Sequence, residues 1–256
     1  MSRPVYFLSD AHLGGESPAR EGPKERSLVA FLDARLPGET VYILGDLFDF
    51  WFDDGEPPPR HAAVLRSLGR LIERGVRCLL MGGNHDYWLR TGRGPGWLER
   101  ELGVEIVDDP HVAEHHGRRL LLAHGDALDG ARGSYGALRY LLRHPLATFG
   151  FGLLPRRFQH GLGALASSTS RRRVTDELVE EVASELRASA TRILAERDVD
   201  AVIAGHVHRP QLVSTPGGEY LNIGDWMFYR TYGALRDGVL SLESSDGGSP
   251  LKPIPR

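Results

Sequence analysis

Five short apolar runs recur along the 256-residue chain, and each ends directly in polar residues. The runs are rich in aliphatic and β-branched residues and have the length of single strands, so each predicts a buried strand. They occupy residues 5–10, 40–46, 76–86, 119–126 and 200–208. Segments with helical spacing of apolar residues separate several of these runs, and this alternation is typical of an α/β fold.

The helical spacing predicts helices over 23–36, 60–74 and 174–197, with Gly75 placed to end the second. Towards the C-terminus, a Pro-Gly-Gly turn between two strand-like runs predicts a hairpin, and 237–248 predicts a further strand. The chain shows no internal repeat and no linker. We therefore expect a single domain over 1–256, interrupted by an insert at about 130–175.

The predicted insert differs from the rest of the chain in charge. Residues 130–175 contain eight arginines and no Asp or Glu, whereas the whole chain has a net charge of −3, so the remainder is acidic. The same stretch is rich in Leu and Phe. A basic and apolar cap of this kind favours an anionic partner with a lipid part, such as a membrane surface. The simpler interpretation is a helical hairpin whose arginines are only solvated.

Cysteine content and hydropathy indicate a cytoplasmic protein. The one cysteine, Cys78, lies inside an apolar run, so we expect a buried thiol and no disulfide. The first ten residues do not have the pattern of a signal peptide, because Asp10 interrupts the apolar stretch. The longest uncharged apolar run in mid-chain, 145–155, is too short to span a bilayer.

The polar residues at the five strand ends are of the same few types. In order they are Asp10 and His12; Asp46 and Asp49; Asn84, His85 and Asp86; His124 and Asp126; His206 and His208. Ligand sites in open α/β folds lie beyond the carboxyl ends of strands, so we expect one shared site. A single His at a strand end is more often structural. Five such ends in succession are hard to attribute to chance.

The donor types point to a metal centre for phosphate chemistry. Asp, His and Asn without Cys suit Mn, Fe or Zn better than a thiolate-rich structural zinc site. The seven candidate ligands are Asp10, His12, Asp46, Asn84, His124, His206 and His208. They are too many for one ion with open positions. They suit two ions bridged by a carboxylate, an arrangement that hydrolyses phosphate esters.

The five motifs resemble those of the calcineurin-like metallophosphoesterase superfamily, in order, from Asp10 to His208. The longer stretches YILGDLFDFWFDD (42–54) and GHVHRP (205–210) resemble a narrower group, the UDP-2,3-diacylglucosamine diphosphatases of lipid A synthesis. The resemblance implies a four-layer α-β-β-α sandwich with two mixed sheets and a helical cap insert. It also implies two divalent metal ions, with Mn²⁺ favoured over Fe or Zn. One ion would be held by Asp10, His12, Asp46 and His208, and the other by Asp46, Asn84, His124 and His206.

The resemblance implies that His85 is not a ligand but a catalytic group near the leaving group, with Asp49 accepting a hydrogen bond from it. The alternative is that His85 only fixes its loop. Typical diphosphatases of this group have Arg at the position of His85. Arg is a permanent phosphate clamp and cannot donate a proton. Arg132, where the group tends to be acidic, is a second departure.

The resemblance implies hydrolysis of the diphosphate of UDP-2,3-diacylglucosamine to UMP and 2,3-diacylglucosamine 1-phosphate (lipid X) by attack of metal-activated water. A nucleotide-sugar lipid would be the substrate, with peripheral contact to the inner face of the inner membrane and no obligate protein partner. His85 favours the alternative, a related enzyme acting on another nucleotide diphosphate or phosphodiester. A non-enzymatic scaffold is disfavoured because the ligand set is complete. An acidic body also fits a nucleic-acid backbone poorly.

Overall fold

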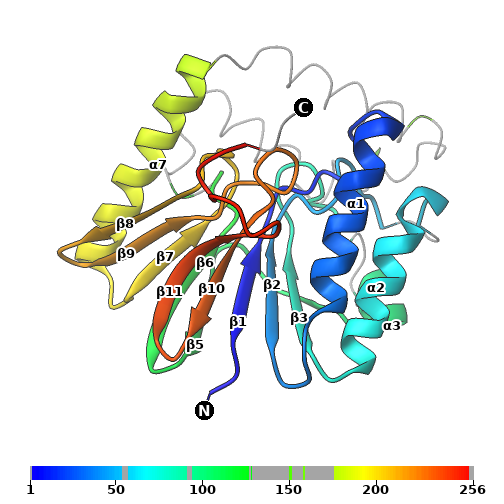
Figure 1. The fold of residues 1–256 in the computed structure, drawn as a ribbon, viewed down its shortest axis with the longest axis horizontal. Coiled ribbons are helices and arrows are strands. Elements are labelled where there is room, and N and C mark those ends of the chain that lie inside the picture. Colours follow the sequence, from blue (N-terminus) through cyan, green and yellow to red (C-terminus); the bar gives the residue numbers. More distant parts are fainter. Residues whose placement is uncertain are drawn as a thin grey trace.

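The computed structural model describes residues 2–53, 57–90, 94–126, 128, 150–151, 158 and 176–253. Its strands form two mixed sheets (Figure 1). The order in the first is β11 (Val239–Ser244), β10 (Thr231–Arg236), β1 (Val5–Leu8), β2 (Thr40–Leu44), β3 (Arg77–Met81) and β4 (Glu105–Ile106). The order in the second is β5 (His111–His115), β6 (Arg118–Ala123), β7 (Ala201–Ala204), β9 (Gly218–Asn222) and β8 (Gln211–Thr215).

Helices cover the outer face of each sheet, which gives the α-β-β-α order of layers predicted from the sequence (Figure 1). The first sheet is covered by α1 (Pro18–Asp33), α2 (Ala62–Glu73), which follows the short 3-10 turn η1 (Pro59–His61), and α3 (Trp97–Leu102). The second sheet is covered by α7 (Asp176–Glu196).

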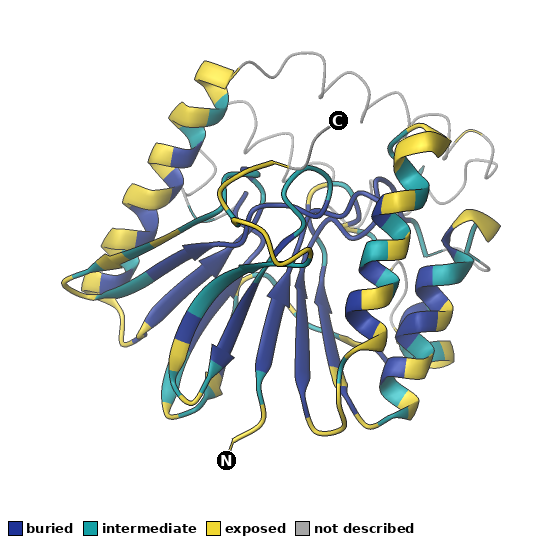
Figure 2. Ribbon diagram, viewed as in Figure 1, coloured by how far each residue is buried: buried dark blue, intermediate teal, exposed yellow. Residues whose placement is uncertain are grey.

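Three apolar layers hold the sandwich together, and the strands are its most buried part (Figure 2). The alternation of side chains along β2 shows how two of the layers arise. Val41 and Ile43 pack towards α1 and α2, whereas Tyr42 and Leu44 pack between the sheets. A strand covered on both faces has no polar side to present. This explains why the central strands are continuous apolar runs.

Several predicted elements differ from the structure at their ends. The first helix begins at Pro18 rather than 23, with Ser17 extended as its N-cap, and it ends at Asp33. Proline at the first helical position lacks only an N–H that would have no intrahelical partner. The second helix ends where predicted, because Gly75 adopts φ +81° and donates its N–H to the carbonyl of Ile72. The predicted C-terminal hairpin is confirmed as β8 and β9.

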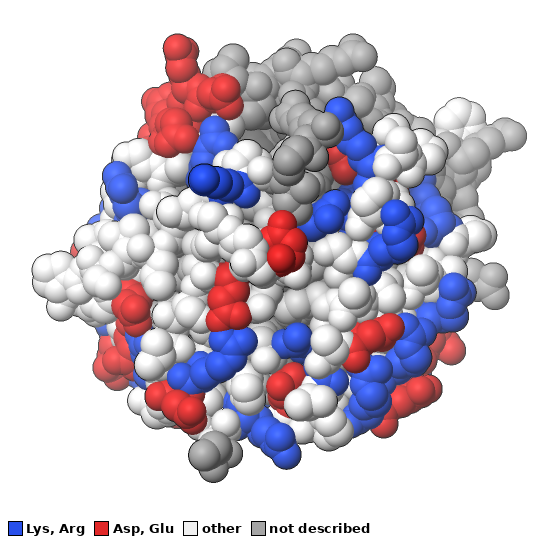
Figure 3. Space-filling model, in the orientation of Figure 1, with Lys and Arg blue, Asp and Glu red and all other residues white. Residues whose placement is uncertain are grey.

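The cap insert predicted at 130–175 lies outside the described residues except for Gly150, Phe151 and Phe158, so it and the single-domain assignment stay predictions. In Figure 3, basic and acidic side chains intersperse over the visible face, and acidic ones gather where α7 begins with Asp176 and Glu177. Cys78 is buried and unpaired as predicted. Within the described parts of the chain, no helix combines the length and apolar character needed to cross a membrane.

Candidate metal centre

The loops that follow β1, β2, β3, β6 and β7 meet at one edge of the sandwich (Figure 1). Main-chain hydrogen bonds hold them side by side. The N–H of Asp10 donates to the carbonyl of Gly45 at 3.1 Å, and that of His12 donates to the carbonyl of Asp46 at 2.9 Å. In the second sheet, the N–H of Gly205 donates to the carbonyl of His124 at 2.9 Å. Candidate ligands distant in the sequence therefore lie close together.

Five of the seven candidate ligands have a left-handed backbone, with φ between 42° and 71°. They are Asp10, His12, Asp46, His206 and His208. Non-glycine residues rarely adopt this conformation, which costs about 1–3 kcal/mol each and clusters at functional sites. The unusual backbone conformations at the strand ends thus occur at residues whose side chains belong to the cluster.

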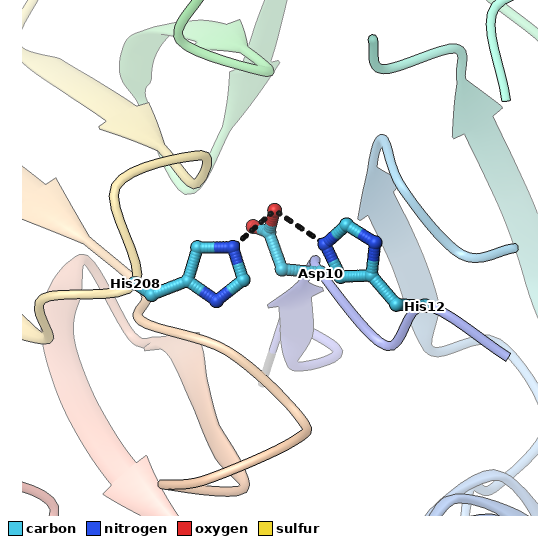
Figure 4. Close-up of side chains that lie close together, drawn as sticks. All are labelled: Asp10, His12 and His208. Atoms are coloured by element: carbon cyan, nitrogen blue, oxygen red, sulfur yellow. Dashed lines mark ion pairs between the residues drawn. The ribbon is translucent and has the colours of Figure 1, made fainter. Parts of the chain in front are cut away.

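Asp10, His12 and His208 form the first part of the cluster (Figure 4). Oδ1 of Asp10 lies 3.7 Å from Nε2 of His12 and 3.5 Å from Nε2 of His208. Nε2 of His12 also lies 3.6 Å from Oδ2 of Asp46. Asp10 is fully buried and His12 is 4% exposed, whereas the side chain of His208 is 27% exposed. The cluster is therefore accessible on the side of His208.

Asp46, Asn84, His124 and His206 form the second part. Oδ2 of Asp46 lies 3.6 Å from Nε2 of His124, which is 3.0 Å from Oδ1 of Asn84. The rings of His124 and His206 are 5.0 Å apart. Nδ1–H of His124 donates to the carbonyl of Leu44, so Nε2 is the nitrogen available to the cluster. Asp46 faces both parts of the cluster, as a bridging carboxylate would.

The residues present fit divalent metal ions. Buried Oδ1 of Asp10 and both ring nitrogens of His12 have no hydrogen-bond partner among the described residues. Buried polar atoms without partners are costly, and a bound cation would satisfy them. Two groups, Asp10–His12–His208 and Asp10–Asp46–His124, each have ligand atoms within 4.8 Å of one another. A third group joins His12 and Asp46 to His85.

Charge coupling in the metal-free cluster shifts pKa values strongly. Burial lowers the pKa of His12, but the carboxylates of Asp10 and Asp49 outweigh burial and raise it to about 10. Burial also opposes the protonated form of His124, yet Asp46 and Asp10 raise its pKa to about 9. Burial and the charge of His124 lower the pKa of His206 to about 4. Two protonated histidines thus balance carboxylate charge that metal ions would otherwise balance.

His85 lies beside the two groups and is oriented by Asp49. Its Nδ1–H donates to the main-chain carbonyl of Asp49 at 3.1 Å, while the Asp49 carboxylate is 3.7 Å from the same nitrogen. The predicted pairing therefore exists mainly through the main chain. Burial lowers the pKa of His85, and Asp46 only partly opposes this effect. The ring meets that of His12 edge to face, with centroids 4.6 Å apart.

Two buried carboxylates support the cluster from behind. Asp86 accepts hydrogen bonds from the N–H groups of Asp46, Phe48 and Gly83. The sequence places Asp86 in the motif but gives it no role. Asp225, which contacts His208, was missed entirely. The sequence feature that could have indicated Asp225 is the Gly-Asp pair after β9. The same pair, Gly45-Asp46, follows β2. Asp126, also in the motifs, is 3% exposed.

The comparisons with known proteins agree with this geometry. Residues 3–210 match the calcineurin-like phosphoesterase family. The chain belongs to this family and is a metal-dependent hydrolase, as the sequence motifs predicted.

Among curated relatives, several are UDP-2,3-diacylglucosamine hydrolases. The Ralstonia nicotianae protein is 35% identical over 95% of this chain and 93% of its own length. The Stutzerimonas stutzeri protein is 33% identical over 87% of this chain and 90% of its own length. Among solved structures, an archaeal phosphodiesterase is 14% identical, with a TM-score of 0.46, over 93% of this chain and 98% of that chain.

Proposed function

We propose that the chain hydrolyses the diphosphate of UDP-2,3-diacylglucosamine and releases UMP and 2,3-diacylglucosamine 1-phosphate. The observation that carries the proposal is the similarity to the Ralstonia nicotianae UDP-2,3-diacylglucosamine hydrolase, which spans 95% of this chain. The family match over residues 3–210 includes every strand end that supplies the cluster. The carboxylate, imidazole and amide groups that meet there suit phosphate ester hydrolysis.

In this proposal, two divalent ions would be bound, with Mn²⁺ favoured and Fe or Zn as alternatives, and Asp46 would be a ligand to both. The first ion would be held by Asp10, His12, Asp46 and His208, and the second by Asp46, Asn84, His124 and His206. When bound, such ions lower the pKa of water and offset phosphoryl charge. The loss of protons from His12 and His124 frees their Nε2 atoms to serve as ligands.

We assign His85 as the group that protonates the leaving oxygen and Asp49 as the residue that orients it. Because Nδ1–H of His85 donates to Asp49, Nε2 is the atom left to exchange a proton with the substrate. The His85 side chain is 14% exposed, so it is reachable from the open side of the cluster. A lowered pKa makes the protonated ring a stronger acid.

The test is release of UMP from UDP-2,3-diacylglucosamine by the purified full chain with Mn²⁺, followed by chromatography. Asp46→Asn should abolish release, because it removes the charge shared by both ions. Asp246→Asn is the matched control, since the hydrogen bonds of Asp246 go to nearby Ser244 and Gly248. Absence of UMP with Mn²⁺, Fe²⁺ and Zn²⁺ in turn would rule out this substrate.

A second candidate function is hydrolysis of another nucleotide diphosphate or a phosphodiester, and His85 is the residue that favours it. A histidine at this position supplies a proton donor, whereas the Arg typical of the resembling diphosphatases supplies only a fixed charge. The rates of hydrolysis of an aryl phosphodiester and of the matching monoester, compared side by side, separate a phosphodiesterase from a phosphomonoesterase. Faster turnover of the diester than of the lipid nucleotide would favour the second candidate.

For location, we propose the cytoplasm, with peripheral contact to the inner face of the inner membrane. The support is the sequence of 130–175, in which eight arginines and many Leu and Phe occur without an acidic residue. Such a segment combines attraction to anionic lipids with apolar insertion. Sedimentation with anionic but not neutral vesicles is the expected result, and equal binding to both would contradict the electrostatic part.

A further inference from the structure

We propose that Lys24, with Glu21, is a positioning residue for the metal ligand His12. The inference rests on the proposed function, because it takes His12 as a ligand. Lys24 and Glu21 both lie on α1, on the turn of the helix that faces the loop after β1. Neither residue belongs to the five motifs that end the strands.

Lys24 is a fully buried charge with few partners. Its Nζ donates to the main-chain carbonyl of His12 at 2.9 Å and lies 3.2 Å from the carboxylate of Glu21. The carboxylate of Glu16 is 4.0 Å away. Burial of an ammonium group costs several kcal/mol unless charge and hydrogen bonds compensate it. Burial also lowers the pKa of Lys24, which Glu21 partly opposes.

Glu21 connects this charge to the loop main chain. Its Oε1 accepts the N–H of Gly14 at 2.9 Å, and its Oε2 accepts the N–H of Glu16 at 3.2 Å. The loop that follows His12 is therefore held at a carbonyl by Lys24 and at two N–H groups by Glu21. Together these contacts hold the main chain at His12, Gly14 and Glu16.

The position and conformation of the His12 main chain decide where its ring lies. His12 has φ +42°, a strained conformation that persists only where the surroundings hold it. In this conformation Nε2 stands between the carboxylates of Asp10 and Asp46, at 3.7 and 3.6 Å. Displacement of the His12 main chain would move the ring out of that position. Lys24 therefore acts on the cluster through the main chain of His12.

The second turn of α1 has an unfavourable sequence, and the proposed role accounts for it. The helix runs through Gly22 and Pro23, although glycine disfavours helix and proline cannot donate to the carbonyl of Ala19. A helix that began at Pro23 would leave Glu21 outside it. The extra turn brings Glu21 and Lys24 to the same face, three residues apart, beneath the loop.

The test is calorimetric titration of Mn²⁺ into the chelator-treated full chain, with unfolding temperatures measured in parallel. The wild type should bind two ions. Lys24→Met should weaken one of the two by about tenfold or more, as expected when an outer-shell partner is lost. The other ion should bind unchanged, and His12→Ala should identify the weakened site. Leu28→Ala, one turn along the same helix and fully buried, is the control that lowers stability while both affinities stay at wild type.

Glu21→Gln keeps the size of the side chain and removes the charge, so it covers the case in which Lys24→Met does not fold. It should weaken the same site selectively. Wild-type affinity at both sites in Lys24→Met or in Glu21→Gln would overturn the inference. An equal loss at both sites, matched by Leu28→Ala, would also overturn it. Fewer than two ions in the wild type would instead overturn the proposed centre, and this inference with it.

Discussion

Asp225 holds Nδ1 of His208 at 3.2 Å, on the side of the ring away from Asp10, which is 3.5 Å from Nε2. A carboxylate can only accept a hydrogen bond, so Nδ1 of His208 carries the proton. Its Nε2 is then available to bind a metal ion. Oδ1 of Asp225 in turn accepts the N–H groups of Phe228 and Tyr229. The orientation of His208 is thereby tied to the loop after β9.

Asp225→Asn should therefore lower metal affinity by about 10–100-fold, the usual cost of losing a carboxylate behind a ligating histidine. The amide can donate to Nδ1 of His208 and so favour the tautomer with its proton on Nε2. Calorimetric titration of Mn²⁺ measures the effect. Asp246→Asn is the control. Wild-type affinity in Asp225→Asn would show that the carboxylate has no part in orienting His208.

Gly83→Ala should disable the cluster, because a Cβ at Gly83 would lie 2.1 Å from Oδ1 of Asp46 and 2.7 Å from its nitrogen. Asp46 would have to move, and displacement of about 1 Å can cost a hundredfold in rate. Gly94→Ala is the matched control, since none of the described residues beyond its chain neighbours comes within 4 Å of its added Cβ. The measurements are kcat/KM and the number of bound ions. Equal activity in the two variants would contradict the contact.

The stability of the metal-free chain should fall as pH rises above 7. His12 and His124 have pKa values raised from 6.5 to about 10 and about 9. Their contribution is fully present below 6.5 and is lost as pH rises through these raised values. Metal ions replace the protons, so the stabilisation by Mn²⁺ should grow with pH. Unfolding temperatures with chelator and with Mn²⁺, compared from pH 7 to pH 9, measure this difference. A constant difference would refute the coupling.

His85→Gln should reduce kcat by about 10²–10⁴-fold for a leaving group that needs a proton. The loss should be much smaller for an aryl ester, whose leaving group departs without protonation. The measurement is kcat of wild type and variant on the lipid nucleotide and on the aryl phosphodiester. An equal reduction on both would indicate that His85 only holds the loop to Asp49. The number of bound Mn²⁺ ions should be the same as in the wild type.

The candidate ligands could be predicted because each follows a continuous apolar strand, and such strands arise from burial on both faces. Some strands that are not continuous apolar runs were not predicted from the sequence. β5 lies at a sheet edge and buries only Ala113, and β10 contains Gly233, where a Cβ would come 2.7 Å from Leu221. Lys24 could not be found either, because its role depends on a contact with His12 that no local spacing records. Asp225 follows a glycine as Asp46 does, but its contact with His208 joins residues 17 positions apart.

The cluster draws its side chains from both sheets: Asp10 and Asp46 follow strands of the first, while His124 and His206 follow strands of the second. The distance between the two halves is set by the apolar layer that Leu44, Leu122 and Ile203 help to fill. Because such layers are close-packed, a change of one methylene group alters their thickness. The inter-sheet core therefore sets the separation of the two halves of the cluster, although none of these three side chains is itself a candidate ligand.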